Sequence, residues 1–255
     1  MRQDQDTGTI HPTALVDPGA EIGSGVTIGP YTIIHGKVQI GPGSVIGAYC
    51  ELGHPAHDPA QGGLLSLGSN THIRSHSVFY EGSVFGDGLM TGHRVTVREQ
   101  TRAGRNLQLG TLADIQGDCV FGDFVRLHSN VHVSKLARIG DYVWLFPSVV
   151  LTNDPHPPSD LHVGVTVEDY AAIAAKSVIL PGVTVGAGAL VGAHSTVCRD
   201  VAPDSVVVGS PARYVCETRE IRLRDGSGAP AYPWRRHFHR GYLPEDVARW
   251  LAECS

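Results

Sequence analysis

The sequence predicts an all-β protein, a left-handed parallel β-helix of about nine to ten triangular coils, from three observations. First, an aliphatic residue recurs at every sixth position in three blocks of the chain, residues 10–52, 67–151 and 167–197. Second, the position two residues before each of these anchors carries a small or β-branched side chain, and glycine often follows the anchor. Third, 31 glycines and 16 prolines among 255 residues, with only 7% aromatic residues, suit a thin prism with many corners. Each six-residue unit is therefore one short strand and one corner, and three units close one coil.

The three blocks and the segments between them divide the chain in order. The β-helix is expected to occupy residues 1–215, with loops at 53–66 and 152–166 that interrupt the repeat. Residues 216–255 lack the repeat and are expected to form a C-terminal extension or cap. In this cap, Pro244, the two acidic residues after it and an apolar face that ends at Leu251 predict a short amphipathic helix. This helix is expected to close the end of the solenoid.

Composition and charge exclude several classes of protein. A net charge of −5 and a pI near 6.2 argue against nucleic acid or an anionic membrane as the main partner. No apolar run is long enough for a membrane-spanning helix, and the polar N-terminus lacks the apolar segment of a signal peptide, so a cytoplasmic protein is expected. The five cysteines are far apart and without C-x-x-C spacing, which predicts free thiols.

The repeat predicts which residues lie above one another. Residues eighteen apart should stack, so His132 should lie beneath Val150, and its side chain should point outward between two inward valines. Both loops should leave the same corner, five coils or roughly 24 Å apart. The site hypothesis is a polar cluster at a groove between subunits, made of Asn130, His132, Asn153, Asp154 and His156. For His132, an ordinary exposed strand histidine is the alternative interpretation.

Several segments resemble a known family of enzymes. Residues 10–14 (I-H-P-T-A) and 209–213 (G-S-P-A-R) resemble the hexapeptide-repeat acyltransferase superfamily. The first loop, L-G-H-P-A-H-D at residues 52–58, is similar to that of acyl-carrier-protein-dependent UDP-N-acetylglucosamine O-acyltransferases, but their I-H-R-G segment is absent. Residues 122–133 together with T-N-D-P-H-P at 152–157 are similar to nucleotide-sugar N-acetyltransferases. The resemblance implies a homotrimer that binds an acyl donor between neighbouring prisms.

The resemblance also implies a reaction: transfer of an acetyl group from acetyl-CoA to the amino group of a nucleotide-linked amino sugar. Asn130 would orient the acceptor or the thioester carbonyl, and Asp154 would hold the ammonium group or accept a proton. Asn153 and His128 would contact the substrate. An amine can attack a thioester without a strong base, whereas a hydroxyl needs one. The alternative reaction is therefore O-acetylation with His156 as general base, since His156 resembles the catalytic histidine of maltose-type O-acetyltransferases.

The donor is expected to bind at the C-terminal coils. Ala174, Gly192 and Ser210 are eighteen residues apart and would form a column of small residues for the pantetheine arm. Arg199 and Arg213 match positions where relatives place basic residues near the CoA phosphates, although either could be a solvated surface charge.

Two other functions remain open. One is a metal enzyme like the gamma-class carbonic anhydrases, for which His93, His128 and His132 are the candidates. Their spacings are not multiples of eighteen, so no metal site is expected. The other is a non-catalytic scaffold, which would not need the T-N-D-P-H-P loop.

Overall fold

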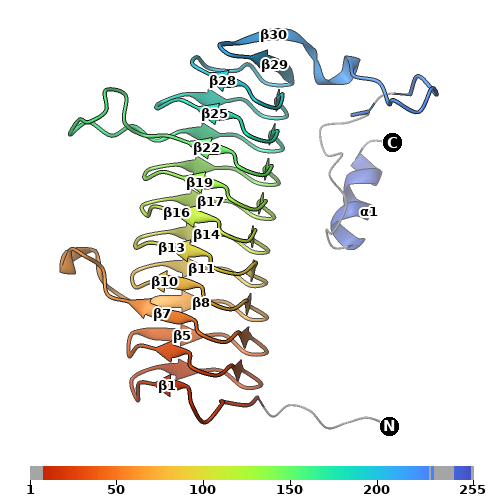
Figure 1. Cartoon of the computed structure of the whole chain (residues 1–255). Helices are drawn as coiled ribbons and strands as arrows, with labels where there is room; N and C mark the ends of the chain where they lie inside the picture. Colours follow the sequence, from red (N-terminus) through yellow and green to blue (C-terminus); the bar gives the residue numbers. More distant parts are fainter. Residues whose placement is uncertain (1–7, 230, 233–243, 254–255) are drawn as a thin grey trace.

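The computed structural model describes residues 8–229, 231–232 and 244–253 and shows a three-sided parallel β-solenoid (Figure 1). Three sheets, here called faces A, B and C, contain eleven, ten and nine strands. The number of parallel strands on each face therefore agrees with the predicted nine to ten coils. The eleventh strand of face A, β30, is antiparallel. The all-β fold class is confirmed.

Each face is a ladder to which every coil adds one short strand. Face A consists of β3 (Thr27–Ile28), β6 (Val45–Ile46), β9 (His72–Ile73), β12 (Met90–Thr91), β15 (Gln108–Leu109), β18 (Arg126–Leu127), β21 (Trp144–Leu145), β24 (Ala172–Ile173), β27 (Leu190–Val191), β29 (Ser205–Gly209) and β30 (Ala212–Glu217). Face B consists of β1 (Leu15–Val16), β4 (Ile33–Ile34), β7 (Glu51–His54), β10 (Val78–Tyr80), β13 (Thr96–Val97), β16 (Asp114–Ile115), β19 (His132–Val133), β22 (Val150–Leu151), β25 (Val178–Ile179) and β28 (Thr196–Val197). Face C consists of β2 (Glu21–Ile22), β5 (Val38–Ile40), β8 (Leu65–Leu67), β11 (Val84–Phe85), β14 (Arg102–Ala103), β17 (Val120–Phe121), β20 (Arg138–Ile139), β23 (Thr166–Val167) and β26 (Thr184–Val185).

The periodic aliphatic residues fill the prism. Ile28, Ile34 and Ile40, one from each face, are each 1% exposed, and the same column continues through most coils. The glycine after an anchor is needed because consecutive coils approach closely. A Cβ atom on Gly29 would lie only 2.8 Å from the backbone nitrogen of Ala48. The register of eighteen residues that the repeat predicts is therefore enforced by both side chains and backbone.

Both insertions leave the corner between faces B and C. The first loop, between β7 and β8, contains a 3-10 turn (η1, Pro59–Gln61), and the second lies between β22 and β23. The strands β7 and β22 are five steps apart on face B, or roughly 24 Å at one strand spacing per step. Figure 1 shows the two loops projecting from the same side of the solenoid, as predicted.

The C-terminal end differs from the prediction in two ways. The last coil is shorter, because Val191 pairs with Val207 at a spacing of sixteen residues. The strands β29 and β30 then form an antiparallel hairpin over this end, followed by the 3-10 turn η2 (Thr218–Glu220). The predicted helix is present as α1 (Pro244–Glu253), but it lies beside the solenoid and does not close its end (Figure 1). Its Val247 packs against the stacked rings of Phe124 and Tyr142 on the flank.

None of the described helices is long and apolar enough to cross a membrane.

Candidate active site

Face B presents a polar column of side chains between the two loops. His132 stacks beneath Val150, as predicted, and above Asp114. Its neighbours Val131 and Val133 are fully buried, so the imidazole points outward. The expected orientation of His132 is confirmed.

His132 and Asp114 form a hydrogen-bonded pair. Nδ1 of His132 lies 3.0 Å from Oδ2 of Asp114, and Nε2 lies 3.3 Å from the hydroxyl of Ser134. The amide of Gln116 donates to both carboxylate oxygens of Asp114, at 2.9 and 2.8 Å. With Nδ1 protonated toward the carboxylate, Nε2 becomes the proton acceptor. The sequence analysis overlooked Asp114, although the eighteen-residue spacing places it directly below His132.

The carboxylate of Asp114 is ionised at neutral pH. The hydrogen bond from His132 lowers the pKa of Asp114, and the contact with Gln116 adds to this against the opposing effect of burial. Both side chains of the pair are somewhat more than a third exposed, 37% for His132 and 38% for Asp114. A ligand lying on face B can therefore reach the imidazole without displacing a covering segment of the described residues.

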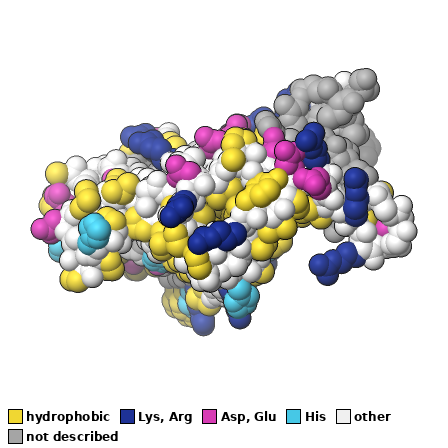
Figure 2. Space-filling view, turned by 90° about the horizontal axis from the view of Figure 1, so that it is seen from above, with side chains coloured by type: hydrophobic (Ala, Val, Ile, Leu, Met, Phe, Trp, Pro, Cys, Tyr) yellow, Lys and Arg dark blue, Asp and Glu magenta, His cyan; other side chains and the backbone are white. Residues whose placement is uncertain are grey.

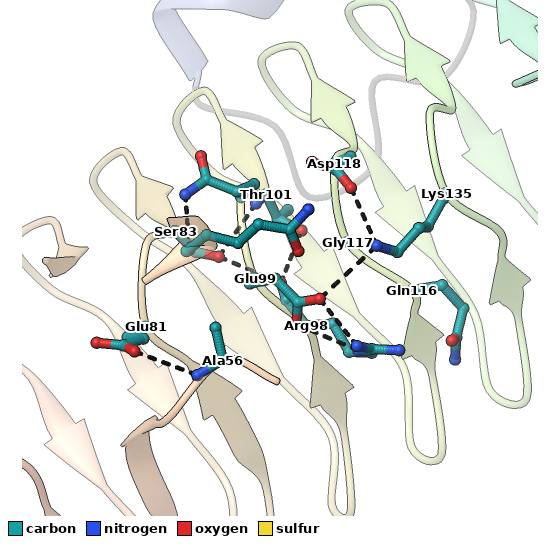
Figure 3. Close-up of polar contacts among 12 residues, drawn as sticks. Ala56, Glu81, Ser83, Arg98, Glu99, Thr101, Gln116, Gly117, Asp118 and Lys135 are labelled. Atoms are coloured by element: carbon teal, nitrogen blue, oxygen red, sulfur yellow. Dashed lines mark hydrogen bonds and ion pairs between the residues drawn. The ribbon is translucent and has the colours of Figure 1, made fainter. Parts of the chain in front are cut away.

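A network of charged side chains lies at the corner between faces B and C (Figure 3). The carboxylate of Glu99 is only 1% exposed and accepts two hydrogen bonds from the guanidinium of Arg98, at 2.8 and 3.2 Å. The ammonium group of Lys135 lies 3.7 Å from Glu99 and 3.2 Å from Asp118. These residues belong to neighbouring coils, so the network ties together the part of the corner between the two loops.

A second histidine–carboxylate cluster lies on face B at the first loop. Oε1 of Glu51 lies 2.9 Å from Nε2 of His35 and 2.8 Å from Nδ1 of His54. Burial alone would raise the pKa of Glu51, but the hydrogen bonds from the two histidines outweigh it, so its pKa is lowered. Strands β7 and β19 are four steps apart, roughly 19 Å, so this cluster is separate from the His132 pair.

Asp154 organises its own loop. Its carboxylate accepts hydrogen bonds from the backbone nitrogens of His156 and Ser159, at 2.9 and 3.0 Å, and from the hydroxyl of Ser159 at 2.7 Å. The Ser159 hydroxyl is the main reason that the pKa of Asp154 is lowered. The backbone oxygen of Asn153 accepts from Val163, and His156 is exposed. Among the described residues, no hydrogen bond or ion pair joins this loop to His132.

The predicted polar cluster is therefore not one compact group. Asn130 is exposed at the corner between faces A and B, which is the opposite edge of face B from the second loop. His128 precedes that corner and stacks on the ring of Phe146, with ring centroids 4.9 Å apart. One turn of chain thus presents His128, Asn130 and His132 around a corner.

The expected column of small residues is broken by the shortened coil. Ala174 and Gly192 do stack, because Ala172 pairs with Leu190. Ser210 does not follow them, since Val208 lies next to Gly192, and the hydroxyl of Ser210 instead donates to Thr196 at 2.8 Å. A Cβ atom on Gly192 would lie 2.5 Å from Cγ1 of Val208, so packing within the chain already requires a glycine there.

Arg199 and Arg213 lie together at the C-terminal end. They line a cavity of about 570 Å³ with Cys198, Asp200 and Tyr214, below the β29–β30 hairpin. Figure 2 looks onto this end and shows basic side chains lying beside apolar ones. The cavity brings together the two arginines that were expected near the donor phosphates.

Within residues 8–229, 231–232 and 244–253, no group of three or more His, Cys, Asp or Glu side chains is arranged to hold a metal ion. Cys50, Cys119, Cys198 and Cys216 are free thiols, and Cys254 lies outside the described residues.

Comparisons with known proteins identify the family. The family described as bacterial transferase hexapeptide (six repeats) matches residues 9–54. The chain is 31% identical over 198 residues to the acyl-[acyl-carrier-protein]–UDP-N-acetylglucosamine O-acyltransferase of Vibrio parahaemolyticus, covering 77% of this chain and 68% of that protein. It is 28% identical over 218 residues to the bifunctional protein GlmU of Mycobacterium tuberculosis, covering 84% of this chain but only 41% of GlmU.

A solved structure agrees at the level of the fold. The UDP-N-acetylglucosamine acyltransferase of Bacteroides fragilis superposes with a TM-score of 0.55 at 19% identity, covering 81% of this chain and 74% of that one. Together with the repeat, the parallel solenoid and the similarity to the Vibrio enzyme, these comparisons show that the chain belongs to the hexapeptide-repeat acyltransferase superfamily.

Proposed function

We propose that the protein transfers an acetyl group from acetyl-CoA to the amino group of a nucleotide-linked amino sugar, with His132 as general base. The observation that carries this proposal is the His132–Asp114 pair, in which the carboxylate fixes the tautomer and Gln116 fixes the carboxylate. A histidine positioned in this way contributes typically 10² to 10⁴ to the rate of a proton transfer.

The chemistry can be written in terms of His132. The acceptor nitrogen attacks the thioester carbonyl carbon, and the carbon–sulfur bond breaks as the carbon–nitrogen bond forms. Nε2 of His132 takes the proton from the nitrogen and returns it to the departing thiolate. Asp114 stabilises the imidazolium between these two transfers. The reaction therefore ends with the neutral thiol and the free imidazole.

The other expected residues have revised roles in this proposal. His132 replaces His156 as the base, because among the described residues His156 is exposed and no side chain orients its ring. Asp154 shapes the second loop, and Asn153 and Asn130 contact the acceptor. The proposed donor site, formed with a neighbouring prism of a homotrimer, uses the C-terminal coils. Its residues are Ala174, Gly192, Arg199 and Arg213, without Ser210, which the shortened coil removes from the column.

A second candidate is transfer to a sugar hydroxyl. The His132–Asp114 pair favours it, because a hydroxyl is almost fully protonated at neutral pH and needs a base, whereas an amine with a pKa of roughly 8 is partly free already. The Vibrio relative, whose name describes an O-acyltransferase acting on UDP-N-acetylglucosamine, supports this candidate and a nucleotide-sugar acceptor in both cases.

Thiol release in the presence of acetyl-CoA and a panel of UDP- and dTDP-sugars tests the proposal. An amide product gains one acetyl group and survives mild alkali, whereas an ester product is cleaved by it. His132→Asn should lower kcat at least a hundredfold with a hydroxyl acceptor and less with an amine. His156→Asn should lower it less than tenfold, and His11→Asn, a change at the far end of the solenoid, should leave it unchanged. Full activity of His132→Asn with every accepted substrate would exclude His132 as the base.

A further inference from the structure

A depression on the outer surface of face A has no role in the reaction as derived so far. Its volume is about 400 Å³, and it spans the coils immediately below His132. Arg74, Arg126 and His128 line it, together with Gly92 and Gly110. We propose that this depression binds the diphosphate of the nucleotide-linked sugar, an inference that rests on the proposed function for the identity of the ligand.

Two glycines of successive coils belong to the lining of the depression. Gly92 and Gly110 follow the strands of two successive coils, between Arg74 below and His128 above. A Cβ atom on Gly110 would lie 2.3 Å from the backbone carbon of His128, and one on Gly92 would lie 2.3 Å from the backbone nitrogen of Thr111. The close approach of consecutive coils therefore requires glycine at both positions, and neither glycine adds a side chain to the lining.

The walls carry positive charge in a protein that is acidic overall. Arg74 is exposed, and among the described residues no carboxylate contacts its guanidinium. The guanidinium of Arg126 lies 4.7 Å from the centre of the Trp144 ring, which orients it along face A. No aspartate or glutamate lines the depression. Guanidinium groups suit phosphate oxygens, and two of them line this depression.

His128 adds a polar group to the same wall. Its Nε2 atom is buried and has no hydrogen-bond partner among the described residues, whereas buried polar atoms in proteins are nearly always paired. Burial, followed by the charge of Arg126, lowers the pKa of His128, so its imidazole is neutral at physiological pH. A neutral imidazole can hydrogen-bond to a ligand without adding to the charge of the two arginines.

The lining of the depression ends at Ser129, three residues before His132. His128, Asn130 and His132 follow one another along a single turn, from face A around the exposed corner to face B. Four residues span at most about 14 Å, and less around a corner. A ligand whose diphosphate binds beside Arg126 and His128 therefore lies on the turn of chain that leads past Asn130 to His132.

Calorimetric titration of the full chain with UDP at low salt tests this inference. Arg74→Met and Arg126→Met should each weaken UDP binding at least fivefold. Arg102→Met is the matched control, because Arg102 is an exposed arginine pointing outward from β14 on face C, and it should bind UDP like the wild type. Inorganic pyrophosphate should displace UDP from the wild type. The melting temperatures of all variants show whether a loss of binding reflects a loss of fold. Because Arg74 is exposed, its substitution is expected to disturb the fold less than that of Arg126.

The outcomes separate this inference from the proposed function. Four results would each overturn the assignment of the depression. Two concern the variants: unchanged UDP affinity in Arg74→Met, or an equal loss of affinity in Arg102→Met. The other two concern the wild type: failure to bind UDP, or failure of pyrophosphate to compete with UDP. Acetyl transfer by the wild type would then still support the proposed function. Conversely, selective loss of UDP binding in the two face A variants would support the depression even if no acceptor released thiol.

Discussion

The pair of His132 and Asp114 gives a prediction whose magnitude follows from one distance. Asp114→Asn keeps the size of the side chain and removes the negative charge that stabilises the imidazolium. Unit charges 3.0 Å apart attract each other by about 1.4 kcal/mol at the dielectric constant of water, which is the limit used for this pair because both side chains are more than a third exposed. This free energy corresponds to about a tenfold decrease in kcat. If the new amide donates to Nδ1, the tautomer is reversed and the decrease becomes larger.

Thiol release at saturating substrate is the assay for this substitution. The expected result is a kcat reduced at least tenfold, with KM for the acceptor changed less than threefold, since the carboxylate acts through the imidazole. Asp87→Asn, which alters an exposed carboxylate bound to the backbone nitrogen of Ser69, is the control and should leave kcat unchanged. A kcat within twofold of wild type for Asp114→Asn, alongside a large loss for His132→Asn, would refute the orienting role of Asp114.

Three further predictions concern acid stability, the buried carboxylate and the thiols. Because the pKa of Asp114 is lowered in the folded protein, its stabilisation is fully present above the unfolded pKa near 3.9 and is lost as pH falls through the lowered folded value. The urea midpoint of the wild type should therefore fall more steeply between pH 5 and pH 3 than that of Asp114→Asn, and parallel curves would contradict this. Glu99→Ala should cost about 2 kcal/mol, because it leaves Arg98, which is 30% exposed, without this carboxylate and Lys135 with Asp118 alone, and should lower Tm by about 4–8 °C in a thermal melt. The exposed Glu21→Ala should change Tm by less than 2 °C, and an equal change in both variants would count against the network. Burial raises the pKa of the Cys119 thiol to about 12, so peptide mapping after brief iodoacetamide treatment of the native protein should find exposed Cys198 modified and Cys119 intact. Modification of Cys119 first would show that its coil opens.

The fold could be predicted in detail because one rule governs every coil. The six-residue period assigned Ile28, Ile34 and Ile40 to three successive faces, and all three are buried there. The backbone conformation of the corners could not be predicted equally well from the sequence. Tyr31 and Tyr49 adopt φ values of 57° and 56°, which an L-residue adopts only at some cost in free energy. The hydrogen-bonded strands on both sides fix the backbone at these corners. The conformational preference of tyrosine alone does not predict this, because it takes no account of the neighbouring strands.

The candidate site was predictable only where it belongs to the repeat. The outward orientation of His132 follows from the alternation of the strand, and the same spacing leads to Asp114. The second loop has no repeat, so its sequence does not show that Asp154 forms its hydrogen bonds within the loop. The carboxylate that His132 contacts is instead that of Asp114. Ser210 was misplaced because the last coil is two residues shorter than the others. The regular repeat before this coil gives no sign of the shortening.

The two loops lengthen their coils by nine and ten residues beyond the eighteen of the repeat, yet the strands after them resume pairing in register. Since each coil pairs only with its neighbours, loop closure is the main free-energy cost of an added residue, and this cost grows slowly with length. Natural variation can therefore replace either loop while the prism stays the same. In this architecture a new acceptor preference can evolve without a compensating change in the core.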